Sequence, residues 1–179
     1  MRSESLSLLG IVCLVLAVPV AAQREHRQPL TEVQAEKIRE AGIEPDERIK
    51  LYAQFVGEHV DTIKGLTPRA HSGARTKRVD NELQDLTALM DELGENLDQY
   101  GGRKADLRKS LKGLAEASKQ WLGTLNALPS EPGFDLSRKE AIDSAKDMAD
   151  QTEQLLKEQT AYFDLHKDEK GQDRAEPKN

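Results

Sequence analysis

The four histidines are the side chains of this chain best suited to acid–base chemistry or metal binding near neutral pH. They are His26, His59, His71 and His166. A metal site on a helix needs two such ligands three or four positions apart, and no two of these histidines have that spacing. Only His59 falls on the apolar face of a predicted helix. We expect it to be a core or seam residue, with a place in a functional site as the alternative.

Nucleophiles and paired carboxylates give no stronger signal. His71 and Ser72 are adjacent, but no strand-to-helix turn surrounds Ser72 to expose its hydroxyl. The neighbouring acids Asp91 and Glu92 point about 100° apart on a helix, so they cannot share a site. No glycine-rich loop follows a strand, as a phosphate or dinucleotide site requires. The sequence therefore predicts no catalytic, cofactor-binding or metal-ligating residue, no cofactor and no enzymatic activity.

A basic cluster lies where a predicted loop meets a predicted helix. It consists of Arg69, His71, Arg75, Lys77 and Arg78. Positive charge at a helix start opposes the helix dipole, which makes the cluster unusual. We expect a solvated loop, with contact to an anionic surface such as lipid headgroups as the alternative. The net charge of −6 argues against nucleic acid as the main partner.

Apolar side chains at alternating steps of four and three define the elements that would position these residues. Such spacing places one stripe along a helix, and the stripe leaves water only by packing against another helix. The first stripe is Val79, Leu83, Leu86, Met90, Leu93, Leu97 and Tyr100. The second is Leu107, Leu111, Leu114, Ser118, Trp121, Leu125 and Leu128. The predicted fold is therefore all-α.

The whole pattern indicates an antiparallel up-down bundle of three to four long helices, preceded by a short one. The short helix is predicted over 31–40 and the long ones over about 45–65, 75–100, 106–128 and 137–166. The side chains expected to matter most for the core are Phe55, Leu86, Leu93, Leu111, Trp121, Leu125 and Phe163.

Capping residues mark several of these boundaries. Thr31 and Gln34 have the spacing of a capping box at the start of the short helix, and Gly42 is its stop signal. Ser137 and Glu140 have the same spacing at the start of the last helix.

Gly101 and Gly102 leave two architectures open. The chain can fold back there, with Gly101 as a left-handed stop and Asp106 capping the next helix, which gives the antiparallel bundle. Alternatively the helix continues through both glycines as an elongated coiled-coil-like rod, at a loss of about 2 kcal/mol relative to alanine. We favour the fold-back.

Residues 1–22 resemble a secretory signal peptide, with an apolar run from Leu6 to Val18 and small residues before a predicted cut after Ala22. An uncleaved membrane anchor is the alternative. The single cysteine, Cys13, lies inside the apolar run, so the processed chain would contain no thiol or disulfide. The remaining chain is expected to divide into a flexible leader (23–29), the helical bundle domain (30–166) and a disordered charged tail (167–179).

Leu30-Thr31-Glu32-Val33-Gln34 matches the LTxxQ motif and resembles the periplasmic Spy/CpxP-like proteins. One copy of the motif occurs in this chain. The resemblance implies a small, exported, helical protein that acts as a chaperone or stress sensor.

These observations lead to one functional expectation. The chain is expected to be a periplasmic or secreted helical module of the cell envelope that acts without catalysis, through a protein partner or self-association. We expect no nucleic acid partner and no stable membrane span after signal cleavage. The alternative is a periplasmic chaperone or stress sensor of the Spy/CpxP type.

Overall fold

A computed structural model of the 179-residue chain describes residues 28–101 and 105–166. Within these ranges the chain forms helices and no strands, so the predicted all-α fold is confirmed. The helices are α1 (Glu32–Glu40), α2 (Pro45–Leu66), α3 (Gly73–Gly101), α4 (Arg108–Asn126) and α5 (Asp135–Leu165). The predicted signal peptide, most of the leader, Gly102 and the predicted charged tail lie outside the described residues.

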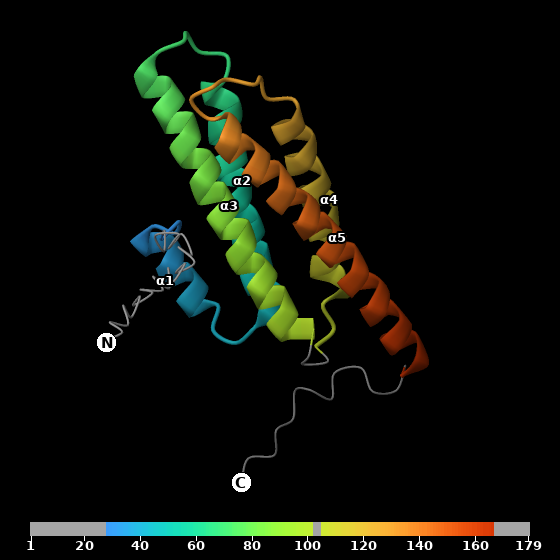
Figure 1. Ribbon diagram of the computed structural model, residues 1–179. Helices are drawn as coiled ribbons and strands as arrows, with labels where there is room; N and C mark the ends of the chain where they lie inside the picture. The colour runs from blue at the N-terminus through green and yellow to red at the C-terminus, as the bar shows by residue number, and fades with distance from the viewer. Residues whose placement is uncertain (1–27, 102–104, 167–179) are drawn as a thin grey trace, which may run out of the picture.

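Helices α2 to α5 form a bundle in which each helix runs opposite to the one before it (Figure 1). Helices α2 and α5 each pack against both α3 and α4, so that α3 and α4 stand at diagonal corners of the bundle. The chain therefore folds back between α3 and α4, as predicted, and the continuous rod is wrong. The connection between α3 and α4 joins helices at opposite corners of the bundle rather than adjacent helices. The spacing of apolar residues along the chain does not encode this diagonal placement.

Two details of this return differ from the prediction. Gly101 is the last residue of α3 and is not left-handed, since Gly42, with φ of 58°, is the positive-φ glycine of the described residues. Asp106 lies one residue before the N-cap of α4, which is Leu107; its Oδ1 still accepts from the Arg108 backbone N–H at 3.4 Å, and its carboxylate pairs with the Arg108 guanidinium at 2.7 Å. Burial of Leu107, which is 1% exposed, moves the helix start inward.

The predicted stripes form the core of the bundle. The seven residues expected to matter most are all buried: Phe55, Leu86, Leu93, Leu111, Trp121, Leu125 and Phe163. Helix α5 contributes a seam of small or polar buried side chains: Ser137, Ala141, Ala145, Ala149, Thr152 and Gln159. Small side chains let α5 approach both of its neighbours closely.

Of the two predicted capping boxes, the first is confirmed and the second is wrong. The Gln34 backbone N–H donates to Thr31 Oγ1 at 3.2 Å, and the Thr31 N–H donates to Gln34 Oε1 at 3.0 Å. Helix α5 begins before Ser137, at Asp135, with buried Phe134 as its N-cap. Ser137 instead lies within the helix, where its hydroxyl donates to Asp80 Oδ1 of α3 at 2.5 Å.

Glycines in and beside α4 give a first prediction about stability. Gly113 lies in the helix, and a Cβ atom there would meet no other atom within 4 Å. We expect Gly113→Ala to raise the free energy of unfolding by about 0.5–1 kcal/mol, because alanine restricts the unfolded chain. At Gly133, by contrast, a Cβ atom would lie 2.2 Å from Thr76 Cγ2. Gly133→Ala should therefore be destabilising. Urea unfolding midpoints that moved in the same direction for both variants would contradict this prediction.

Candidate functional site

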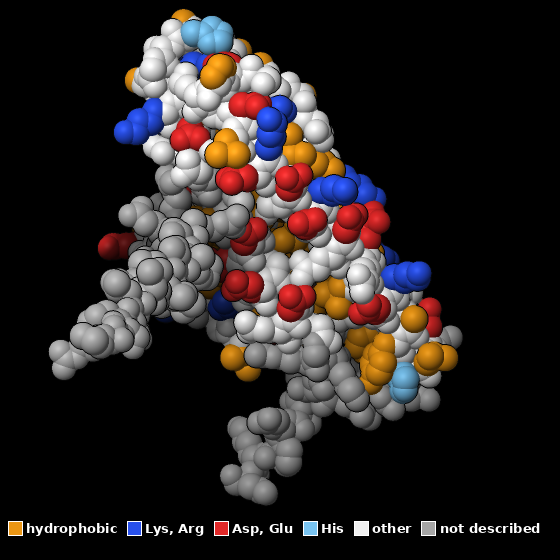
Figure 2. Space-filling model, in the orientation of Figure 1, with side chains coloured by type: hydrophobic (Ala, Val, Ile, Leu, Met, Phe, Trp, Pro, Cys, Tyr) orange, Lys and Arg blue, Asp and Glu red, His pale blue; other side chains and the backbone are white. Residues whose placement is uncertain are grey.

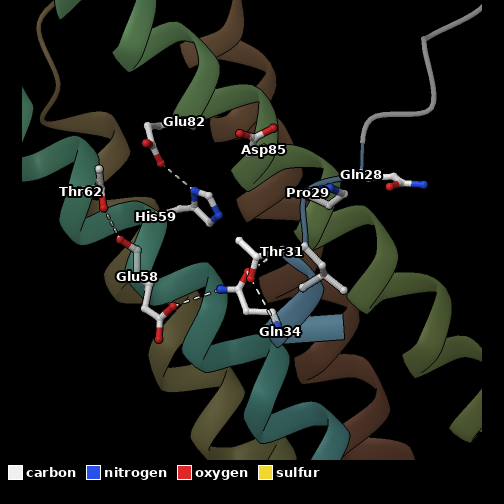
Figure 3. A pocket seen from close by; sticks show the side chains of 10 residues that line it. Gln28, Pro29, Thr31, Gln34, Glu58, His59, Thr62, Glu82 and Asp85 are labelled. Carbon is white, nitrogen blue, oxygen red and sulfur yellow. Dashed lines mark hydrogen bonds and ion pairs between the residues drawn. The ribbon is translucent and has the colours of Figure 1, made fainter. Parts of the chain in front are cut away.

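An open cavity of about 470 Å³ lies between the start of α1 and the middle of the α2–α3 pair. Figure 3 shows His59 directed toward Glu82, with Thr31 and Gln34 on the other side of His59. The lining side chains of the cavity are Gln28, Pro29, Leu30, Thr31 and Gln34 at the start of α1, Glu58, His59 and Thr62 from α2, and Glu82 and Asp85 from α3.

His59 and Glu82 form the central pair of this cavity. The Nδ1 atom of His59 lies 2.8 Å from Glu82 Oε2, and the two side chains are 15% and 20% exposed. His59 thus lies at the seam between α2 and α3, close to the surface and beside a carboxylate. In acid–base catalysis, a carboxylate placed in this way orients the imidazole that acts as the general base.

The hydroxyl groups of the cavity are directed elsewhere. Thr62 Oγ1 donates to the Glu58 carbonyl oxygen at 2.8 Å, and Thr31 Oγ1 donates to Gln34 Oε1 at 3.0 Å. Neither hydroxyl is therefore placed as a nucleophile that His59 could activate.

The motif at residues 30–34 contributes a wall of the same cavity. Beyond its capping role, Gln34 donates from Nε2 to Glu58 Oε2 of α2 at 3.2 Å. The sequence identified His59 and the motif separately. Only the fold of α1 against α2 brings them together, and no periodicity in either segment signals that pairing.

The basic cluster is not a single solvated patch, because Arg75 is buried. Its Nη1 lies 2.7 Å from Glu131 Oε2, and its Nη2 donates to Glu131 Oε1 at 3.1 Å. Arg75 also donates from Nε to the Leu66 carbonyl oxygen at 3.2 Å and from Nη2 to the Thr67 carbonyl oxygen at 2.6 Å. Hydrogen bonds from Arg75 lower the pKa of Glu131. The expectation of a solvated loop is therefore wrong for Arg75, although Arg69, Lys77 and Arg78 are exposed.

The burial of Arg75 follows from its position in the fold. The residue lies in the first turn of α3, close to the end of α2 and to the connection between α4 and α5. Its guanidinium lies at the end of the bundle and donates to the carbonyl groups of Leu66, the last residue of α2, and of Thr67, its C-cap. Glu131, its partner across the bundle, gives no local signal in the sequence.

Further buried and half-buried polar side chains tie separate elements of the bundle together. The Tyr52 hydroxyl donates to Glu92 Oε1 at 2.5 Å, and burial followed by this hydrogen bond raises the pKa of Tyr52. Gln159 of α5 accepts from the Leu107 N–H and donates to the Ala105 carbonyl, both at 2.8 Å, which fixes the chain entering α4. In the described part of the chain, every buried side-chain nitrogen or oxygen has a partner.

Neither a metal-binding cluster nor a membrane-spanning helix occurs within the described ranges. No set of three or more histidine, cysteine, aspartate or glutamate side chains within 28–101 and 105–166 is arranged to hold a metal ion. None of the helices described has the length and apolarity needed to cross a membrane.

The fold and site together define an all-α protein built on a four-helix bundle with one additional N-terminal helix. Comparison with protein-family models, curated proteins and solved structures found no match to this chain.

Asp135, at the start of α5, gives a prediction about pH. Hydrogen bonds from Lys139, Ser130 and Arg138 lower its pKa to about 2. The folded carboxylate therefore stabilises the protein above the pKa of an unfolded aspartate, about 3.9, and this contribution is lost as the pH falls through about 2. We expect Asp135→Asn to lower the urea unfolding midpoint at neutral pH, and the difference from wild type to shrink between about pH 4 and pH 2.

Asp143 provides the matched control for this measurement, because it is an exposed aspartate further along the same helix. Asp143→Asn should change the midpoint little at either pH. A deficit of Asp135→Asn that stayed constant from neutral to acid pH would contradict the assignment.

Proposed function

We propose that this chain is an exported, non-catalytic helical module of the cell envelope that acts through contacts with proteins, including further copies of itself. One observation carries the proposal. Buried and half-buried polar side chains join separate elements of the bundle: Arg75 of α3 joins Glu131 in the connection between α4 and α5, and Tyr52 of α2 joins Glu92 of α3. Guanidinium, carboxylate and phenol groups, which serve as catalytic groups in many enzymes, here hold the bundle together.

The outer surface is consistent with contact-based function. Figure 2 shows acidic side chains spread over the middle of the face formed by α3 and α5, with basic side chains along its edge. The large exposed apolar side chains are separated: Val33 and Ile43 belong to α1 and the turn after it, and Leu136 and Leu165 to opposite ends of α5. Such a surface suits reversible, mainly polar contacts rather than a permanent apolar interface.

Export and self-association can be tested on the same preparation. Mass spectrometry of the protein recovered from the culture or envelope fraction of its native cell should give a chain that begins at Gln23, as cleavage after Ala22 requires. Sedimentation equilibrium of that chain over a hundredfold concentration range should show reversible association. A chain that retained residues 1–22 would refute signal cleavage. A monomer at every concentration that also crosslinks to no envelope protein in intact cells would refute the proposed mode of action.

The alternative proposal is a chaperone or stress sensor of the Spy/CpxP type. Its support is the motif at residues 30–34, in which Thr31 and Gln34 form the α1 cap and a wall of the cavity. A chaperone of this kind should present a continuous apolar concavity to its clients. Light scattering of a thermally aggregating client protein separates the two proposals: suppression at equimolar ratio favours the chaperone, and unchanged aggregation favours the contact module.

Acid–base catalysis is a third candidate function, favoured by the His59–Glu82 pair in an open cavity. The proposal of a non-catalytic module predicts that hydrolysis of an activated ester is equally slow in the wild type and in His59→Gln. A large loss of rate in that variant, but not in the exposed-histidine variant His71→Gln, would instead support catalysis at His59.

A further inference from the structure

The attachment of α1 to the rest of the protein is slight. This nine-residue helix has one buried residue, Ile38, and packs mainly against α2. In Figure 1 it lies beside the four-helix bundle rather than within it. Two side-chain hydrogen bonds join it to α2: Gln34 donates to Glu58 at 3.2 Å, and Arg48 donates to the Ile38 carbonyl oxygen, also at 3.2 Å. We call this attachment surface, marked by Arg48 and Glu58, the α1 seat.

The polar groups of the α1 seat keep partners when α1 leaves it. Arg48 also donates to the Tyr100 hydroxyl at 2.7 Å and to Asn96 Oδ1 at 3.4 Å. Glu58 also accepts from Gln54 at 2.8 Å. Release of α1 therefore leaves no charged group of the seat without a hydrogen bond, and the main loss is the burial of Ile38.

Helix α1 also keeps its own N-terminal cap when it moves, because Thr31 and Gln34 bond to each other rather than to the bundle. It remains joined to α2 by a short turn that contains Gly42, with φ of 58°, and Ile43, which is 84% exposed. A short hinge next to an exposed apolar side chain favours domain swapping, in which identical chains exchange the helix attached to the hinge.

We infer that the α1 seat of one copy accepts α1 of a second copy, so that two chains associate by reciprocal exchange of this helix. The inference rests on the self-association in the proposed function and names the surface that makes it. The occupant follows from the structure itself, because the seat already fits this helix and an identical copy offers the same Ile38, Gln34 and carbonyl group. Exchange also places the two exposed Ile43 side chains at the new contact between the copies.

The test removes the turn that returns α1 to its own chain. Deletion of Gly42 and Ile43 leaves too short a connection for α1 to reverse direction onto its own α2. We expect the purified chain that begins at Gln23, carrying this deletion, to change from mainly monomer to mainly dimer in multi-angle light scattering, with its helical circular dichroism retained. Adding Ile38→Asp should return it to monomer, because the arm can no longer enter the seat. Adding Val33→Asp, on the exposed face of the same helix, should leave the dimer intact.

A crosslink identifies the exchange directly. In the deletion background of the chain that begins at Gln23, which contains no cysteine, one preparation carries Gln34→Cys and the other Glu58→Cys. Mixing and refolding them, followed by a short bismaleimide crosslinker, should join the two chains through these thiols, since the side chains of Gln34 and Glu58 meet across the seat. Substituting Val33→Cys for Gln34→Cys should abolish most of that product.

The outcomes separate the inference from the proposed function. A deletion variant that stays monomeric with its bundle folded, or a dimer that survives Ile38→Asp, overturns α1 exchange. If the wild type nevertheless associates in sedimentation, the proposed function stands without it. If neither the wild type nor the deletion variant associates, both self-association and exchange fail.

Discussion

Replacing Arg75 by methionine is expected to lower the free energy of unfolding by about 3–5 kcal/mol, the range for removing one partner of a buried ion pair. Arg75 is 6% exposed and donates hydrogen bonds to Glu131 and to two backbone carbonyl groups at the end of α2. Methionine occupies a similar volume but supplies no donor. The carboxylate and both carbonyl groups would then be left without this partner at the end of the bundle.

Arg78 provides the control for this variant, because its side chain is 62% exposed and its distance to Glu82 is 3.9 Å. Arg78→Met should change the stability by less than about 1 kcal/mol, as expected for a surface ion pair. Chemical unfolding followed by circular dichroism gives both values. Equal losses in the two variants would show that Arg75 acts as one more surface charge, contrary to its contacts.

Truncating Leu86 to alanine is expected to have an effect of similar size, about 2–5 kcal/mol. Leu86 is 0% exposed, in the middle of the α3 stripe. Alanine there leaves a cavity between tightly packed helices, which lose dispersion contacts as well as buried apolar area. Leu111→Ala, at an equally buried position of α4, should behave alike. Since the total stability of a domain this size is about 5–15 kcal/mol, either loss is a large share of it.

Leu136 provides the matched surface position, since it is a leucine on a helix that is 71% exposed. Leu136→Ala should change the stability by no more than about 0.5 kcal/mol. Thermal unfolding of the three leucine variants orders them directly. If Leu86→Ala and Leu111→Ala melted within a degree of the wild type, the assignment of both stripes to the core would be wrong.

The sequence was sufficient to predict the helices and their buried faces. The steps of four and three along α3 and α4 identify side chains such as Leu93 and Leu125, because burial of a helix depends on its own periodicity. The capping box at Thr31 was equally accessible, since both of its residues are local. The second capping box was wrong because burial of Phe134 moves the helix start, and that burial depends on neighbours in space.

The candidate site was less predictable for the same reason. His59 was identified on its own, but its partner Glu82 lies on another helix and the wall at Gln34 on a third. The basic cluster was misjudged at Arg75, because Glu131 approaches it from a distant connection. Contacts between helices depend on which corners of the bundle they occupy, and no spacing along the chain encodes that choice.

The diagonal placement of α3 and α4 has a consequence for how the chain acquires its structure. The helices that follow one another across residues 102–107 share little surface, so this junction cannot act as an early nucleus. The helices instead pair as two hairpins, α2 with α3 and α4 with α5. The α4–α5 hairpin must form before it can bury the remaining apolar surface of α2 and α3. Folding therefore waits for loop closure over long stretches of chain, which slows it relative to a bundle with sequential neighbours. A chain emerging from the ribosome or a translocation channel would keep the α2–α3 stripes accessible until α5 arrives, which is the interval in which a second chain can engage them.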